Sequence, residues 1–113
     1  MTEIIEKARK LVEIKELFPE GEERIIYLLQ IAEIDIRVYL TYEEANRVAN
    51  FFRRAIRKIL REGIGKIEIV ELKTSKIYYL VRIAGFDIKP YLAIEEATRV
   101  ANYMENVVKK ILE

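Results

Sequence analysis

Two aspartates, Asp35 and Asp87, have the repeated placement that most directly suggests chemistry in this chain. A pair of carboxylates can contribute to the metal site of a nuclease. The chain has no His, no Cys and a single Ser, so it lacks the partners for nucleophilic pairs and for imidazole or thiolate metal sites. Because two Asp without a third ligand make a poor metal site, we interpret them as hairpin partners of Gln30 and Arg82. We therefore expect a protein that is not an enzyme and that uses no metal and no cofactor.

Tyrosines and basic residues alternate with other side chains in residues 24–39 and 76–91. If these stretches are strands, every second side chain falls on the same face of a sheet. Tyr rings can stack on bases, and Arg or Lys can bind phosphates, which is how an open sheet holds unpaired DNA or RNA. The residues that this pattern assigns to single-stranded nucleic acid are Arg37, Tyr39, Tyr78, Arg82, Lys89 and Tyr91.

The same predicted face carries aliphatic side chains at its centre, namely Ile26, Leu28 and Leu80. Aliphatic groups suit burial against the other half of the chain or against a second subunit, with the charges as a solvated rim. The face therefore supports two interpretations, a nucleic-acid surface and a self-association surface. The second predicts a homodimer or a larger oligomer.

A basic run follows in residues 51–61, where Arg54, Lys58 and Arg61 share one helical face. A ridge that binds phosphates is one interpretation. The other is the charged outer face of a helix in a protein from a hot environment.

The composition limits the classes of protein to which the chain can belong. It has 113 residues, 51% hydrophobic and 35% charged, and its net charge is only +1. Such a balance creates no global field for nucleic acid or membranes, so only local patches can act. Many Glu, Lys, Arg and Ile with no Cys form a hyperthermophile, archaeal-like pattern. Because no signal peptide or membrane-spanning run is recognisable, we expect a cytoplasmic protein without membrane partners.

An internal repeat organises the chain. Residues 27–60 align without gaps on 79–112 at an offset of 52, with 18 of 34 positions identical. Residues 12–17 match 67–72 if the first copy has three extra residues in the loop that follows. We expect one domain of residues 1–113 made of two repeats, about 11–63 and 64–113, with a short N-terminal helical lead-in.

Within each repeat the hydrophobic period changes from 2 to 3.6, which predicts three strands followed by a helix. The fold class is therefore α+β, a pseudo-symmetric duplication of a βββα unit with the helices packed on one face of antiparallel sheet. Residues 2–10 favour a short helix, although a helix continuing to Leu17 fits the pattern equally. Thr41 and Glu44 predict a helix N-terminus with a capping box.

Two-residue turns predict the hairpin register. In the second copy the expected partners are Ile83 with Phe86, Arg82 with Asp87, Val81 with Ile88, Leu80 with Lys89 and Tyr78 with Tyr91. In the first copy they are Gln30 with Asp35, Leu28 with Arg37 and Ile26 with Tyr39. Pro90 lacks an N–H group and should lie on an edge strand or at a position without a ladder hydrogen bond.

The order of elements and three sequence segments resemble the Pur and whirly class of single-stranded nucleic-acid-binding repeat proteins. The segments are Ile14-Lys15-Glu16, Tyr27 to Glu33, and Arg37-Val38-Tyr39-Leu40 leading directly into a helix. The resemblance implies an intertwined pair of repeats, stacking and basic contacts on the sheet, and dimers. It agrees with non-catalytic binding of single-stranded nucleic acid, and the alternative is a self-associating structural or regulatory interaction module.

Overall fold

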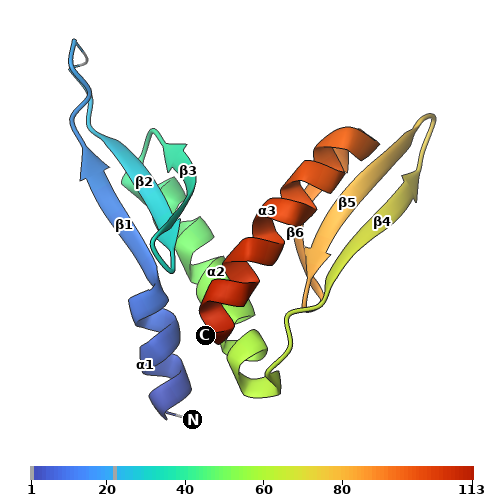
Figure 1. Cartoon of the computed structure of the whole chain (residues 1–113). Coiled ribbons are helices and arrows are strands. Elements are labelled where there is room, and N and C mark those ends of the chain that lie inside the picture. The colour runs from blue at the N-terminus through green and yellow to red at the C-terminus, as the bar shows by residue number, and fades with distance from the viewer. Residues whose placement is uncertain (1, 22) are drawn as a thin grey trace. The chain divides into compact units, whose positions relative to one another are not determined.

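The structure is a computed structural model that describes residues 2–21 and 23–113. The chain divides into two compact units, unit 1 (Met1–Arg61) and unit 2 (Glu62–Glu113). Each unit holds its own three-stranded antiparallel sheet, in the orders β1-β2-β3 and β4-β5-β6 (Figure 1). The predicted α+β class and the repeated three-strand order are confirmed. The packing of both helices on one face stays a prediction.

Unit 1 begins with a helix that leads directly into its first strand. Its elements are α1 (Thr2–Leu11), β1 (Val12–Leu17), β2 (Ile26–Ile31), β3 (Ile34–Tyr39) and α2 (Tyr42–Glu62). The helix stops at Leu11 because the chain from Val12 onward pairs with β2, and the Ala32 N–H donates to the Leu11 carbonyl at 2.8 Å. The longer helix to Leu17 is therefore not formed, since sheet pairing replaces local helical preference there.

Unit 2 repeats the same order without a counterpart of α1. Its elements are β4 (Ile67–Lys73), β5 (Ile77–Ile83), β6 (Phe86–Leu92) and α3 (Ile94–Leu112). The Ala84 N–H donates to the Lys66 carbonyl at 2.8 Å, as Ala32 donates to Leu11. Gly63 ends α2 with a φ of 72°, a left-handed conformation that glycine adopts without steric cost.

The β2–β3 hairpin of unit 1 and the β5–β6 hairpin of unit 2 each close through the predicted two-residue turn. Both turn residues have positive φ in each unit, Ala32 and Glu33 in the first and Ala84 and Gly85 in the second. Such φ values are typical of type I′ turns, whose twist matches that of antiparallel strands. Three of the predicted pairs next to these turns are confirmed, Gln30 with Asp35, Arg82 with Asp87 and Ile83 with Phe86.

The two repeat helices start differently. The Glu44 N–H donates to Thr41 Oγ1 at 3.2 Å, which confirms the Thr41 half of the expected capping box of α2. Ala93 precedes α3 and provides no side-chain cap. Glu95 and Glu96 in the first turn of α3 still favour the positive end of the helix.

The core of unit 2 joins its sheet to α3. Val81 and Leu92 form one buried cluster with Ala97 and Ala101, and Tyr79 packs against that cluster. In unit 1 the most deeply buried strand residues are Val12, Leu29 and Ile31. Among the described residues, no helix is both long and apolar enough to cross a bilayer.

Candidate nucleic-acid interface

The two repeated aspartates are engaged by neighbouring side chains. The Gln30 Nε2 group donates to Asp35 Oδ1 at 2.6 Å, and Arg82 Nε donates to Asp87 Oδ1 at 2.8 Å. The hydrogen bond and the charge of Asp87 raise the pKa of Arg82 further above its ordinary value. Within the described ranges no group of three or more potential metal ligands occurs. The interpretation of both Asp as hairpin partners is confirmed.

A bulge in β3 changes which side chains share a face in unit 1. Past the turn the register slips by one residue, so that Leu29 is opposite Arg37 and Leu28 is opposite Val38. Paired residues of antiparallel strands point to the same face. We call the side away from Leu29 and Ile31 the open face of unit 1; it is formed by Glu13, Lys15, Leu17, Ile26, Leu28, Gln30, Asp35 and Val38. The predicted pairs Leu28 with Arg37 and Ile26 with Tyr39 are wrong.

Tyr39 is consequently on the buried side of unit 1. It lies opposite Tyr27 and is only 7% exposed. The Arg37 guanidinium lies 5.5 Å from the centre of its ring. Burial raises the pKa of Tyr39 above its ordinary value, partly offset by Arg37 and assisted by Glu44. The prediction that Tyr39 and Arg37 belong to the open face is wrong, because one inserted residue reverses the side on which they lie.

Unit 2 has an additional bulge near the end of β6. Val81 lies opposite Lys89 and Tyr79 lies opposite Leu92, so two register shifts follow the turn. The predicted pairs of Val81 with Ile88 and of Leu80 with Lys89 are therefore wrong. The predicted placement of Lys89 on the same face as Tyr78 and Arg82 is also wrong, because its pairing with Val81 puts it on the other side of the sheet. The second shift falls around Pro90, which lies on an edge strand as expected for a residue without an N–H group.

The second bulge turns Tyr91 outward. Leu92 is 4% exposed in the core, whereas Tyr91 is 65% exposed. Its ring meets the ring of Tyr78 edge to face, with centres 5.7 Å apart and planes at 84°. The two tyrosines are thus neighbours although the ladder does not pair them in the predicted register. We call the side of unit 2 away from Val81 its open face; it is formed by Glu68, Val70, Leu72, Tyr78, Leu80, Arg82, Asp87 and Tyr91.

The three aliphatic candidates for an oligomer interface differ in accessibility. Leu80 is only 4% exposed within the single chain, so it has almost no surface left for a partner. The prediction that Leu80 is accessible to a second subunit is therefore wrong. Ile26 and Leu28 are half-buried, and Val38 beside Leu28 is 49% exposed. Val38 is a residue of this face that the assumed register missed.

The predicted basic ridge lies on α2 in unit 1. Arg54 is exposed and its guanidinium is 5.9 Å from the centre of the Phe51 ring. Arg61 is exposed and Lys58 is half-buried. Together with Arg57, which sequence analysis omitted, Arg54 and Arg61 line a hollow that Ile4 and Ile5 of α1 complete. The spacing of these three arginines, at steps of three and four residues, was the signal available in the sequence.

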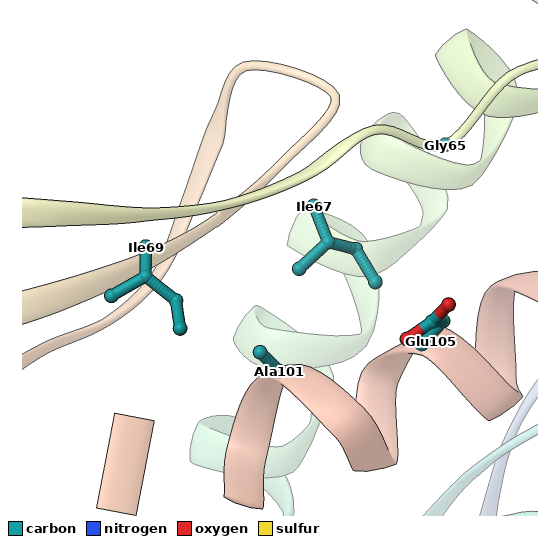
Figure 2. A pocket seen from close by; sticks show the side chains of 5 residues that line it. All are labelled: Gly65, Ile67, Ile69, Ala101 and Glu105. Carbon is teal, nitrogen blue, oxygen red and sulfur yellow. The ribbon is translucent and has the colours of Figure 1, made fainter. Parts of the chain in front are cut away.

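A second hollow, of about 430 Å³, lies within unit 2 between β4 and α3. Figure 2 shows Ile67 and Ile69 extending from the strand toward Ala101 and Glu105 of the helix, with Gly65 at one end. In unit 1 the residue equivalent to Glu105 is Arg53. Its guanidinium donates to the Val12 carbonyl at 3.4 Å and to Asn50 Oδ1 at 2.8 Å.

Comparison of the chain with protein-family models, with curated proteins and with solved structures finds no match.

Proposed function

We propose that the protein binds single-stranded nucleic acid without catalysis and that Tyr91 is the principal stacking residue. The observation that carries this proposal is the exposure of the Tyr91 ring together with its edge-to-face support from Tyr78. A base stacked on Tyr91 would meet a ring already held in place, so little side-chain freedom remains to be lost on binding.

The backbone of Tyr91 supports the same proposal. Its φ is +58°, a conformation that costs an aromatic residue about 1 kcal/mol or more. In unit 1 the equivalent residue, Tyr39, is buried and has a negative φ. A tyrosine at this position of the repeat can therefore be buried, and the exposure of Tyr91 is specific to unit 2. Strained residues cluster at functional sites. An exposed aromatic ring on a strained backbone therefore favours recognition over packing.

The basic residues that this proposal assigns to phosphate contacts differ in part from those predicted from the sequence. Lys89 is exposed on the same edge strand as Tyr91 but on the Val81 side of the sheet, so it meets phosphates where the nucleic acid passes around this edge. Arg37 is exposed in unit 1. Arg82 is held by Asp87, so its charge is already compensated. Arg54, Lys58 and Arg61 stay predicted phosphate contacts on α2.

Fluorescence anisotropy with a labelled oligothymidylate of 12 nucleotides tests the proposal at about 50 mM salt, where charges are weakly screened. Tyr91→Ala should lower affinity by about 1–3 kcal/mol. Lys89→Gln should flatten the slope of log affinity against log salt by about 0.7. Tyr103→Ala, which removes a partly exposed tyrosine from α3, is the matched control and should change neither quantity. Absence of wild-type binding to both DNA and RNA strands would refute the proposal.

The second candidate function is self-association as a structural or regulatory module. It is favoured by the open face of unit 1, where Leu28 and the half-exposed Val38 form adjacent aliphatic positions. Leu40, two residues further along the chain, is 68% exposed. No aromatic stacking residue lies among the open-face residues of unit 1, so this unit suits a partner protein better than bases.

A further inference from the structure

Three arginines on the C-terminal half of α2 face α1 across a hollow of about 230 Å³ in unit 1. Arg54, Arg57 and Arg61 are spaced as neighbours on one helical face. Ile4 and Ile5 of α1 complete the lining. The hollow therefore has a cationic side and an apolar side.

Among residues 2–21 and 23–113, no carboxylate forms an ion pair with any of these three arginines. Ion pairs of the described residues join Arg9 with Glu6, Lys66 with Glu68 and Arg82 with Asp87, and none of these pairs involves Arg54, Arg57 or Arg61. Three guanidinium groups side by side repel one another unless an anion lies between them. Arg57 is half-buried, so part of its charge is shielded from bulk water, which strengthens its interaction with any anion that enters.

The second repeat shows that this cluster is not an inherited property of the helix. The positions equivalent to Arg54, Arg57 and Arg61 carry Asn106, Lys109 and Glu113, whose formal charges cancel. Unit 2 also lacks a counterpart of α1. The arginine cluster therefore occurs only in the unit that has the helix needed to complete the hollow.

We propose that the hollow between α1 and α2 is a phosphate-binding site, in which Arg54, Arg57 and Arg61 contact the phosphate oxygens. The planar guanidinium matches phosphate through paired hydrogen bonds. Ile4 and Ile5 supply an apolar wall for the organic part of the ligand. The phosphate belongs either to the backbone of a nucleic-acid strand or to a free phosphate compound, and the site stands on observations independent of Tyr91.

Isothermal titration calorimetry of the full chain with sodium pyrophosphate measures the site directly. Wild type should bind one pyrophosphate per chain, and Arg57→Gln and Arg61→Gln should each weaken binding about tenfold. Arg61 is exposed, so its replacement keeps the test valid if Arg57→Gln impairs folding. Lys109→Gln removes a charge from the equivalent helix position of unit 2 and should change affinity less than about twofold.

A labelled oligothymidylate distinguishes the two sources of phosphate. Displacement of pyrophosphate by the oligonucleotide, with oligonucleotide binding weakened by Arg61→Gln, assigns the site to a nucleic-acid backbone. Pyrophosphate binding that the oligonucleotide does not displace assigns it to a free phosphate compound. Tyr91→Ala should leave pyrophosphate affinity unchanged in both cases, so failure of the stacking surface and failure of this site give different results.

Three outcomes would overturn the proposal. The first is that the arginine replacements affect neither pyrophosphate nor oligonucleotide binding. The second is that Lys109→Gln weakens pyrophosphate binding as much as Arg61→Gln, which indicates general charge attraction. The third is that a hexaglutamate peptide binds more tightly than pyrophosphate, which assigns the hollow to an acidic protein segment.

Discussion

Arg53 shows how a single position can distinguish two repeats with the same order of elements. Its guanidinium connects α2 to the Val12 carbonyl of β1 and to Asn50, and its Nε is buried without a hydrogen-bond partner within the described residues. Glu105 at the equivalent position lines an open hollow instead. The arginine stem and its donors thus contribute to the closure of unit 1 at a place where unit 2 stays open.

Exchanging these residues should lower the stability of unit 1 and raise the stability of unit 2. Arg53→Glu removes both hydrogen bonds and should lower the free energy of unfolding of unit 1 by about 1–3 kcal/mol. Glu105→Arg should raise that of unit 2 by about 0.5–1.5 kcal/mol, because the arginine stem covers Ile67 and its guanidinium can reach a strand carbonyl. Hydrogen exchange of β1 and β4 amides under mild denaturant measures each unit separately. A loss of protection in both variants would contradict the assigned role.

Tyr39 predicts a pH dependence of stability. Because burial raises its pKa in the folded chain, the neutral ring stabilises the fold fully below the ordinary tyrosine pKa of about 10. That contribution is lost as the pH rises through the folded pKa, since ionisation then opposes burial. In urea unfolding, the free energy of unfolding of wild type should therefore fall relative to that of Tyr39→Phe as the pH rises from about 9 to about 12. A constant difference across this range would show that Tyr39 ionises equally in both states.

At the scale of the element, the bulges in β3 and β6 decide which side chains reach the surface. Both third strands have one bulge after the turn, and β6 has a second at Pro90, where unit 1 has Val38. An inserted residue moves the following side chains to the other face. As a result Tyr39 is buried and Leu40 exposed in unit 1, whereas Tyr91 is exposed and Leu92 buried in unit 2.

Replacing Pro90 should bury Tyr91 and expose Leu92. Pro90→Val restores an N–H group, allows the register of unit 1, and should turn Tyr91 inward and Leu92 outward. A cysteine at position 91 should then react with a thiol reagent at least about tenfold more slowly in the Pro90→Val background, as burial lowers thiol accessibility. Cysteine introduced at position 64, an exposed site outside the sheet, is the control for general reactivity. Equal rates in the two backgrounds would mean that Pro90 does not cause the bulge.

At the scale of the whole molecule, self-association as the function predicts an oligomer in which the open face of unit 1 is buried against a second copy of the chain. The aliphatic positions Leu28 and Val38 of this face remain accessible, whereas Leu80 does not. Burying such a surface against a partner removes apolar area from water, which stabilises the assembly by about 25 cal/mol per Å² before the cost of association.

Val38→Lys should therefore shift the solution mass toward that of the monomer in sedimentation equilibrium at about 20 μM, because a charged group within an apolar contact is costly to desolvate. Ile64→Lys, which changes another exposed aliphatic residue but one outside the strands, should leave the mass unchanged. Leu80→Asp should instead destabilise unit 2, since its side chain is buried in the single chain. A monomeric wild type under these conditions would rule out this mode of assembly.

The sequence by itself determined the features that depend on local chemistry. The repeat follows from the match of residues 27–60 with 79–112, and the order of strands and helices, the two-residue turns and the Thr41 cap follow from residues close together in the chain. The Asp35 and Asp87 partners were also predictable, because these residues lie only five positions from Gln30 and Arg82. Each of these features is governed by periodicity, turn geometry or short-range charge pairing.

Only the tertiary structure decided which of the candidate residues are accessible. The opposite positions of Tyr39 and Tyr91, the burial of Leu80 and the grouping of Arg57 with α1 were not readable from alternation alone. The physical reason is that a strand has a period of two, so a bulge of one residue reverses every assignment beyond it. Whether a bulge forms depends on pairing with a neighbouring strand, and whether two helices enclose a hollow depends on packing between residues about fifty positions apart in the chain.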